Sequence, residues 1–530
     1  MKISAIFASR GKKKVRKGRP AGPWVTARKT VQYLALLIFV VLFVQAQRDG
    51  WPGNVVNLPM RLDPLIVLGH LLASRTFLAG SAVALIVVLL TLVFGRAWCG
   101  WLCPLGTTLD LFPLRRWRGD RPAPAEGWRK VKYLLLVATL VAALLGNLAL
   151  LFFDPLALWF RSLTVALWPA ADRLLTAAEA LLYRIPALAG PVSTFDGWIR
   201  PLLFPTAPAF YRDALLFAGI FLGVILLNLL APRSWCRYLC PLGGLLGLLG
   251  KVALFRRQVD EECKGCTLCT GICPTGTIDP ARGYRSDPGE CTVCMDCVEV
   301  CPRGLNVFKP GLLPAVWQPY DPGRREALVT IGAAVAGVAL LRSGLLARRE
   351  PPFLLRPPGV RETNPDPAAF TKCTRCGECL RACPTHALQP SVFDAGLEGL
   401  GSPVFVMRLG FCDYSCTACG QACPVQAIPP LGLEQKRLQV VGLATIDQNR
   451  CIPWSDHKPC IVCQEMCPLP DKAVQLEQAE IQEADGTRLT LQLPRVVRDL
   501  CIGCGICEYQ CPVNGEAAIR VYVPEASTQF

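Results

Sequence analysis

The stretch CKGCTLCTGICP at 263–274, followed after a spacer by CTVCMDCVEVCP at 291–302, is the most specific motif in this chain. Each half has the spacing C-x2-C-x2-C-x3-C-P. Bacterial proteins with this tandem spacing hold two [4Fe–4S] clusters, and the fourth cysteine of each run binds the other cluster. The proline after each last cysteine turns the chain away from a helix. The sequence therefore predicts a two-cluster ferredoxin domain over 251–322, with the ligands Cys263, Cys266, Cys269, Cys273, Cys291, Cys294, Cys297 and Cys301.

Other uses of these cysteines fit less well. Zinc ribbons place two C-x2-C pairs around a long loop and lack the third cysteine of each run. A disulfide framework would scatter its cysteines, whereas all 28 here fall into motifs and every four-cysteine run ends in Cys-Pro. Three histidines and no C-x-x-C-H exclude bis-histidine haem b and c-type haem. Iron–sulfur chemistry is the remaining interpretation.

A second cysteine-rich region, 368–530, carries four more runs. Insertions widen its second and third runs, and eight residues separate Cys451 from Cys460, but no ligand is lost. Four further [4Fe–4S] clusters are therefore expected, six in all. The runs could pair sequentially, third with fourth and fifth with sixth, or in a nested order, third with sixth and fourth with fifth. His386 and His457 are expected to lie at the surface or to shield clusters. The ligands are Cys373, Cys376, Cys379, Cys383, Cys412, Cys416, Cys419, Cys423, Cys451, Cys460, Cys463, Cys467, Cys501, Cys504, Cys507 and Cys511.

Upstream of the ferredoxin motif the chain is apolar. Hydrophobic residues make up 52% of the sequence and charged residues only 18%, with a mean hydropathy of +0.35. This composition is typical of a protein with a membrane portion. Apolar segments at 31–46, 76–95, 131–153 and 214–231 are long enough, or nearly so, to form four transmembrane helices.

The net charge of +16 does not indicate nucleic-acid binding, because the basic residues crowd the ends of apolar segments and form no stripe on a folded domain. Such crowding follows the positive-inside rule. It predicts a basic cytoplasmic tail at 1–30, with 96–130 and 232–325 inside and 47–75 and 154–213 outside. The basic residues are Arg10, Lys12, Lys13, Lys14, Arg16, Lys17, Arg19, Arg115, Arg116, Arg118, Arg121, Arg129 and Lys130.

The segment 31–250 contains an internal repeat. WCGWLCPLG at 98–106 and WCRYLCPLG at 235–243 each follow an apolar segment, and D-P-L occurs once in each half, at 63–65 and 154–156. Two units in the same direction imply a pseudo-two-fold axis along the membrane normal. The axis would bring together two cysteine pairs spaced i, i+4, which a helix places on one face. They could hold a seventh cluster or metal, or merely allow close packing: Cys99, Cys103, Cys236 and Cys240.

Polar residues near the D-P-L turns are candidates for a quinol pocket, because quinol oxidation releases protons and needs a base at the membrane edge. They are Asp63, His70, Asp154 and Arg161. Alternatively, the aspartates cap the following helices and the arginine extends its charge to the membrane surface. The segment 171–184 has amphipathic patterning and is expected to lie along the outer membrane face.

A twin-arginine pair, Arg324–Arg325, precedes a mildly apolar run, as in export signals. The segment 323–349 is therefore predicted to be a fifth transmembrane helix, with a cytoplasmic packing helix as the alternative. A Pro-rich linker at 350–367 separates it from the last domain. The predicted fold is an α-helical membrane domain, a four-helix repeat plus this fifth helix, with two small α+β bacterial-type ferredoxin domains.

With these motifs in view, residues 1–310 resemble the NapH-type membrane subunit of the quinol dehydrogenase associated with periplasmic nitrate reductase. The likeness rests on the four helices, the two C-x3-C-P motifs, the D-P turns and the two-cluster ferredoxin. Residues 323–530 resemble the NapG/MauM family of exported four-cluster ferredoxins, through the twin-Arg start, the LRPPG stretch at 355–359 and the widened run at Cys451. The fusion of two subunits departs from the family pattern and leaves the acceptor open.

The resemblance implies an oxidoreductase of the bacterial inner membrane. It would pass electrons from membrane quinol through [4Fe–4S] clusters to a periplasmic c-type cytochrome or terminal reductase. Its first ferredoxin domain would be cytoplasmic and its C-terminal domain periplasmic. The alternative hypothesis is a non-enzymatic electron relay for cofactor maturation or redox regulation, as in methylamine dehydrogenase systems.

Overall fold

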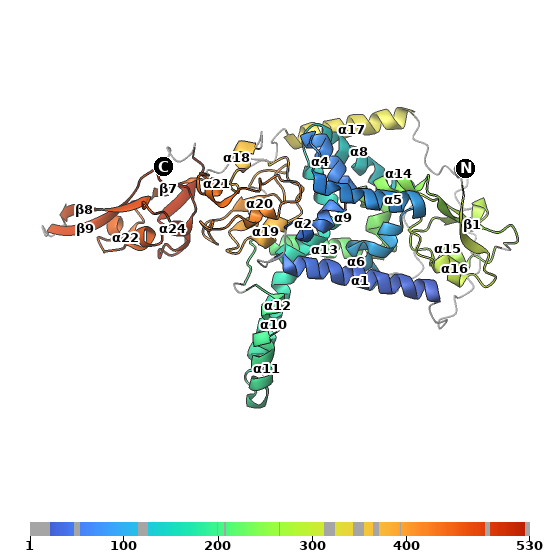
Figure 1. The fold of residues 1–530 in the computed structure, drawn as a ribbon, viewed down its shortest axis with the longest axis horizontal. Coiled ribbons are helices and arrows are strands. Elements are labelled where there is room, and N and C mark those ends of the chain that lie inside the picture. The colour runs from blue at the N-terminus through green and yellow to red at the C-terminus, as the bar shows by residue number, and fades with distance from the viewer. Residues whose placement is uncertain are drawn as a thin grey trace, which may run out of the picture.

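The computed structural model describes residues 22–46, 53–114, 126–198, 200–205, 208–263, 265–311, 324–342, 354–363, 370–392, 394–482 and 488–524. A helical domain occupies the middle of the molecule, and the two cysteine-rich domains lie at its opposite ends (Figure 1). The cysteine-rich domains are small α+β units, as predicted. The expected basic tail and the basic residues at 115–121 lie largely outside the described residues.

The helical domain is built from two similar halves. The first half contains α1 (Pro23–Gln45), α2 (Gly53–Val56), α3 (Leu58–Arg61), α4 (Pro64–Ser74), η1 (Ala79–Val83), α5 (Ala84–Phe94), η2 (Trp98–Leu102) and α6 (Pro104–Leu111). The second half contains η3 (Glu126–Arg129), α8 (Lys130–Leu144), η4 (Ala149–Phe153), α9 (Pro155–Ser162), η5 (Leu163–Leu167), α10 (Trp168–Leu182), α11 (Pro186–Trp198), α12 (Arg200–Leu203), α13 (Ala214–Leu226), η6 (Leu227–Leu229), η7 (Trp235–Leu239) and α14 (Pro241–Gly250). The sequence repeat is thus also a structural repeat, in which α4, η2 and α6 correspond to α9, η7 and α14.

Helix boundaries differ from the apolar segments at two places. Helix α1 begins at Pro23, inside the expected tail, because proline is favoured at the first helical position and Arg28 forms an ion pair with Asp296, at 3.1 Å. Helix α8 ends at Leu144, before Gly146 takes the left-handed conformation, with φ of 83°. The rest of the third apolar segment forms the short turn η4.

Only α1, among the described helices, is both long and apolar enough to cross a membrane, with a mean hydropathy of 1.8 over its best window. Shorter apolar helices form α4, α13 with η6, α14, and α5 with part of η1. Helix α17 (Arg324–Arg342), the expected fifth span, packs along α8 (Figure 1). Its apolar part, 331–340, is one of the shorter helices.

Helices α10 to α12 form an arm that projects sideways from the body, across the direction of α1 (Figure 1). An ion-pair network holds the arm together, because Arg200 contacts Asp172 at 2.9 Å and also pairs with Glu179. Large apolar side chains remain exposed on the arm, among them Leu174 and Trp198. The amphipathic segment predicted at 171–184 therefore lies on this arm.

The first ferredoxin domain has the expected α+β form. Strand β1 (Phe255–Val259) pairs antiparallel with β4 (Asn306–Pro310), and Gln258 lies opposite Val307. The small hairpin of β2 (Ile278–Asp279) and β3 (Arg285–Ser286) precedes the second cysteine run. The domain's short helices are α15 (Leu268–Ile272), η8 (Pro280–Arg282) and α16 (Asp296–Val300).

The C-terminal domain consists of two cysteine-rich units. The first contains α18 (Val360–Thr363), α19 (Glu378–Ala382), β5 (Leu388–Pro390), β6 (Pro403–Phe405), α20 (Ala418–Gln421) and α21 (Leu433–Arg437). The second contains β7 (Leu443–Ile446), α22 (Ile452–Ser455), α23 (Val462–Glu465), β8 (Val474–Gln482), β9 (Arg488–Val496), α24 (Ile506–Tyr509) and β10 (Ile519–Tyr522). Antiparallel pairs β5–β6, β7–β10 and β8–β9 form its sheets.

The described part of the expected Pro-rich linker, 354–363, packs into this C-terminal domain. Leu355 and Val360 are buried, and the N–H of Phe405 donates to the carbonyl of Leu355 at 2.9 Å. One continuous core of buried apolar side chains runs from the helical domain into the C-terminal domain. The two domains therefore pack as one body.

Candidate functional site

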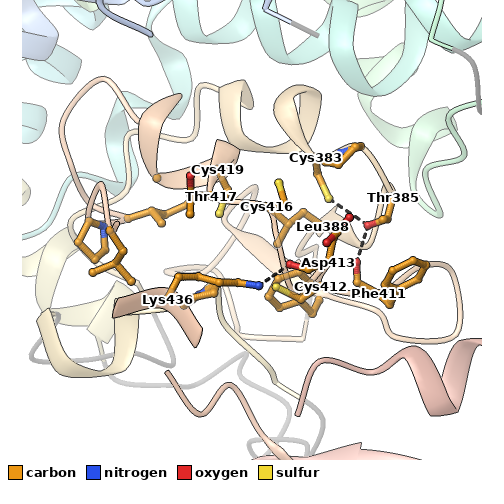
Figure 2. A pocket seen from close by; sticks show the side chains of 17 residues that line it. Cys383, Thr385, Leu388, Phe411, Cys412, Asp413, Cys416, Thr417, Cys419 and Lys436 are labelled. Carbon is orange, nitrogen blue, oxygen red and sulfur yellow. Dashed lines mark hydrogen bonds between the residues drawn. The ribbon is translucent and has the colours of Figure 1, made fainter. Parts of the chain in front are cut away.

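The cysteines of the C-terminal domain gather in groups of four, each with three cysteines from one run and the last cysteine of its neighbour; three of these groups line cavities. Site 3 is lined by Cys373, Cys376, Cys379 and Cys423. Site 4 is lined by Cys383, Cys412, Cys416 and Cys419 (Figure 2). Site 6 is lined by Cys451, Cys460, Cys463 and Cys511. In site 5, Cys501 and Cys504 interact with Cys467, beside Cys507. The pairing of runs is therefore sequential.

The first ferredoxin domain shows the same exchange of fourth cysteines. Cys273 interacts with Cys291, Cys294 and Cys297, which defines site 2. The remaining four cysteines make up site 1, which contains Cys263, Cys266, Cys269 and Cys301. Backbone N–H groups of 303–306 lower the pKa of Cys301 below 9.0, although its partial burial opposes them.

These cavities fit [4Fe–4S] clusters better than single metal ions. No three His, Cys, Asp or Glu side chains in the described part of the chain converge on one metal position. Burial raises the pKa of Cys412 to about 12, although Lys436 opposes the shift. Figure 2 shows the sulfur atoms of site 4 around the cavity, with Lys436 bonded to the Asp413 carbonyl. Thiols in such surroundings become ligands when bound iron supplies the positive charge that stabilises the thiolates.

The C-x3-C-P cysteines lie on turns of the same unusual form in both halves. The N–H of Cys103 bonds to the Trp98 carbonyl at 3.0 Å, and that of Cys240 bonds to the Trp235 carbonyl at 2.9 Å. These bonds span five residues, so η2 and η7 are π-helical turns, which often mark functional sites. The expected single α-helical face is therefore not formed, since Cys103 and Cys240 instead cap the helices that follow.

Two arginines tie the C-x3-C-P turns to each other across the repeat. Arg233 donates to the carbonyl of Cys99 at 3.0 Å, and Arg96 donates to the carbonyl of Cys236 at 3.5 Å. All four cysteines are buried, and each pair interacts with the other. The C-x3-C-P site thus brings together Cys99, Cys103, Cys236 and Cys240, as the repeat predicts.

Site 2 docks directly on the C-x3-C-P site. The indole N–H of Trp101 donates to the Val293 carbonyl at 2.8 Å. Glu290, just before the cysteine run, is buried and pairs with Lys132 at 2.5 Å and Arg96 at 3.3 Å. Burial would raise the pKa of Glu290, but the charges of these partners hold it below 4.5.

We expect Gly100→Ala to loosen this contact. A Cβ at Gly100 would lie 2.0 Å from the carbonyl oxygen of Thr292, so the site 2 loop must move away. Overpacking of this kind costs about 1–3 kcal/mol, and thermal unfolding followed by fluorescence should report it. Gly127→Ala is the control, because a Cβ there meets nothing within 4 Å. Equal unfolding temperatures for the two variants would contradict the expected contact.

Asp63 and Asp154, both predicted as quinol-pocket residues, meet inside the helical domain. Each is fully buried and caps its helix: Asp63 accepts from Leu65 at 2.8 Å, and Asp154 accepts from Leu156 at 2.9 Å. Their Oδ2 atoms receive no hydrogen bond from any other described group, and the two carboxyls face each other. Burial raises the pKa of Asp63 to about 6, and burial and repulsion by Asp63 raise that of Asp154.

The other two pocket candidates lie against the C-terminal domain. His70 is half-buried and interacts with the backbone of Val425, which lines site 3. Arg161 is fully buried and donates to the Arg375 carbonyl at 3.1 Å, so it does not extend to solvent. The structure thus places the two aspartates together, one from each repeat, whereas His70 and Arg161 contact residues of site 3.

Sequence reasoning missed the buried charges beside the cysteines. Arg96 and Arg233 each stand three residues before a cysteine, so the repeat extends to R-x-W-C, which a closer comparison of the halves could have found. Arg375 and Arg381 gave no such signal, because arginine within a cysteine run is usually exposed. His386 is buried beside Tyr211, with ring centroids 6.4 Å apart, which agrees with shielding.

Comparison with protein families supports the cysteine sites. A model described as a 4Fe-4S binding domain matches residues 76–120 and 214–260, the two C-x3-C-P regions. A 4Fe-4S dicluster domain matches 372–427, and another 4Fe-4S binding domain matches 494–515. No solved structure matches the chain.

Several curated proteins are similar to this chain. The methylamine utilization ferredoxin-type protein MauM of Methylorubrum extorquens is 36% identical over 38% of this chain and 90% of its own length. The ferredoxin-type protein NapG of Escherichia coli is 34% identical over 38% of this chain and 85% of its own length. The methylamine utilization ferredoxin-type protein MauN of Methylorubrum extorquens is 29% identical over 52% of this chain and 83% of its own length.

Proposed function

Because this chain belongs to the family of MauM- and NapG-type ferredoxin proteins and transfers electrons through iron–sulfur centres, we propose that it is a quinol dehydrogenase component of the bacterial inner membrane. It takes electrons from membrane quinol and delivers them to a periplasmic acceptor such as a c-type cytochrome or terminal reductase. Residues 1–310 supply the NapH-like part, and 323–530 supply the NapG-like part. When bound, each [4Fe–4S] cluster accepts and donates one electron.

The observation that carries this proposal is the order of the cysteine sites through the molecule. Helices α15 and α16, which belong to the domain of sites 1 and 2, lie at one end of the molecule (Figure 1). The C-x3-C-P site in the helical domain contacts site 2 through Trp101, and site 3 contacts the helical domain through Arg161. Sites 4 and 5 are adjacent, since the N–H of Cys412 donates to the Cys504 carbonyl at 2.8 Å. Site 6 is the last in this series of cysteine sites and lies beside strand β9.

The outer surface of the helical domain supports a membrane location. Leu37, Leu85 and Leu89 are 58%, 59% and 60% exposed on α1 and α5, and Leu215 on α13 is 89% exposed. Exposing these leucines to water costs free energy, whereas contact with lipid tails does not. The arm of α10 to α12 lies across the direction of α1 and carries further exposed apolar residues, as an interfacial element would. The two ferredoxin domains then stand on opposite sides of the bilayer, the C-terminal one in the periplasm.

The Asp63–Asp154 pair is the proposed proton acceptor for quinol oxidation. Two facing carboxyls without another donor are stable only when they share a proton, because two buried like charges repel. Quinol gives up two electrons to the clusters and two protons. The half-protonated pair takes the first proton, passes it to solvent, and then takes and passes on the second in the same way. His70 and Arg161 lie on the site 3 side of the helical domain, through their contacts with Val425 and Arg375.

Anaerobic mixing of the detergent-purified, cluster-loaded protein with a ubiquinol or menaquinol analogue tests this function. Bleaching of the iron–sulfur absorbance in well under a second is expected. Asp154→Asn should slow it about 100-fold, since general-base catalysis contributes about 10²–10⁴-fold. Asparagine still caps a helix, so the fold is retained.

Asp279→Asn is the matched control, because Asp279 also caps a helix, accepting from Ala281 at 2.9 Å, but lies in the first ferredoxin domain. Absence of bleaching by either quinol, in protein that dithionite still reduces, would overturn the quinol dehydrogenase proposal. The second candidate would then hold: an electron relay for maturation or redox regulation of a partner, which the similarity to MauM and MauN favours.

A further inference from the structure

Five arginines are among the largest fully buried side chains, and all of them lie beside cysteine sites: Arg96, Arg161, Arg233, Arg375 and Arg381. The first and third pair with carboxylates at the C-x3-C-P site. The other three gather at site 3, where the helical and C-terminal domains meet. Buried guanidinium groups are costly unless negative charge compensates them.

Arg161 reaches site 3 from the helical domain. It lies on α9, and its guanidinium donates to the carbonyls of Arg375, at 3.1 Å, and Phe152, at 3.2 Å. Its Cζ lies 3.7 Å from the centroid of the Phe152 ring. The Nε atom receives no partner from the described residues. Its direct contacts in the described residues are thus two carbonyls and an aromatic ring, and no carboxylate forms an ion pair with it.

The site 3 thiolates act on the positive charge of Arg161. Burial lowers the pKa of Arg161 to about 9, and the negative charges that Cys376, Cys373 and Asp154 carry when ionised oppose this shift, with Cys376 the largest of them. Gly377, between Cys376 and Cys379, packs so closely that a Cβ there would lie 3.3 Å from the Arg161 Cα. A negatively charged cluster at site 3 would add a counter-charge beside Arg161, which already contacts the site 3 loop.

Arg375 and Arg381 add to the positive charge around site 3. Arg375 lines the cavity and donates to the Phe370 carbonyl at 2.9 Å. Arg381 pairs with Glu378, and its Cζ lies 4.6 Å from the centroid of the Phe43 ring on α1. Two buried carboxylates, Glu378 and Glu398, offset part of this charge.

Among the described residues, fewer buried cations lie beside the other sites of the C-terminal domain. Lys436 acts on cysteines of sites 4 and 5. A carboxylate, Asp447, acts on Cys451 of site 6, and Glu508 acts on Cys507 of site 5. Positive charge stabilises a reduced cluster, which carries one more negative charge, and so raises its reduction potential.

We propose that the cluster at site 3 has the highest reduction potential in the C-terminal domain and that Arg161, a positioning residue from the helical domain, sets this potential. This inference rests on the proposed ligation of a cluster by Cys373, Cys376, Cys379 and Cys423. Site 3 then receives electrons where the two domains meet, and the packing of the helical domain against site 3 sets the reduction potential of its cluster.

The test is a redox titration of the full-length, cluster-loaded protein followed by electron paramagnetic resonance. Cys376→Ser marks the signal of site 3, because it changes a ligand of that cluster only. In the unmodified protein this signal should be the first of the four C-terminal signals to appear on reduction. Arg161→Gln should shift the site 3 signal to lower potential. Arg161→Lys keeps the positive charge, so its site 3 potential should stay close to that of the unmodified protein.

Two further variants complete the test. Glu378→Gln removes a buried negative charge beside Cys376 and should shift the site 3 signal to higher potential. If Arg161→Gln does not bind its clusters, this variant still tests whether buried charge sets the site 3 potential. Arg408→Gln is the control, because Arg408 donates to the carbonyls of Cys511 and Val513, at 2.9 and 2.6 Å, away from site 3.

An unchanged site 3 potential in Arg161→Gln, or in Glu378→Gln, would overturn this inference. So would a site 3 signal that appears after those of the other C-terminal sites. Iron content distinguishes this failure from failure of ligation, because a protein without a cluster at site 3 would lack about four iron atoms.

Discussion

Cys379→Ala is expected to unfold the first unit of the C-terminal domain. Cys379 lies on α19, a helix of five residues, and the neighbouring strands β5 and β6 have three residues each. Elements this short do not hold together on their own. Structural metal supplies about 10–16 kcal/mol of folding free energy in zinc fingers, which is comparable to the whole stability of a domain, about 5–15 kcal/mol.

Iron analysis and hydrogen exchange measure this effect. The variant should lose about four iron atoms, the content of one cluster, and amide protection over 370–427. Cys266→Ala is the matched control: it should lose the same iron, but Cys266 is exposed in the other ferredoxin domain, so protection over 370–427 should persist. Full protection in Cys379→Ala would mean that apolar packing, not ligation, holds the unit.

Glu290→Ala is expected to have the second largest effect, a destabilisation of about 3–5 kcal/mol, because it leaves two cations buried without their partner. The Lys132 side chain is 0% exposed and that of Arg96 1%. The Tyr133 hydroxyl also loses its acceptor, which lies at 3.1 Å. The first ferredoxin domain should then separate from the helical domain more readily.

Denaturant unfolding and limited proteolysis at the junction of the two domains check this result. Glu516→Ala removes the partner of Arg520 in an ion pair whose glutamate side chain is 67% exposed, and it should cost less than about 1 kcal/mol. If both variants unfold at the same denaturant concentration, Glu290 does not hold the interface.

Much of the cysteine chemistry could be read from local spacing. A run of the form C-x2-C-x2-C-x3-C-P is contiguous, so the loop that presents its thiols forms from neighbouring residues. The motif therefore predicted that Cys273 lies with the cysteines of the other run, as it does. The repeat of W-C-x-[WY]-L-C-P-L-G also predicted correctly that Cys99 and Cys236 meet. The D-P-L turns carried enough information to single out Asp63 and Asp154.

Other features depend on contacts between distant residues. Spacing i, i+4 suggested an α-helical face for Cys99 and Cys103, whereas a hydrogen bond spanning five residues forms a π turn. Both orders of run pairing satisfy the same motifs, and only the packing around Cys423 and Cys511 selects the sequential one. The sequence placed Arg161 near the membrane edge, but its guanidinium donates to the carbonyl of Arg375, 214 positions away.

The sequence by itself determined the cysteine runs with 4Fe-4S spacing, the two-fold repeat of the helical domain and the α+β form of the ferredoxin domains, because each follows from the order of nearby residues. Only the tertiary structure decided which runs pair, that Glu290 joins site 2 to Lys132, and that Arg161, Arg375 and Arg381 gather at site 3. The physical reason is burial. A charge can leave water only where distant parts of the chain supply its partners, and no local pattern records where those parts meet.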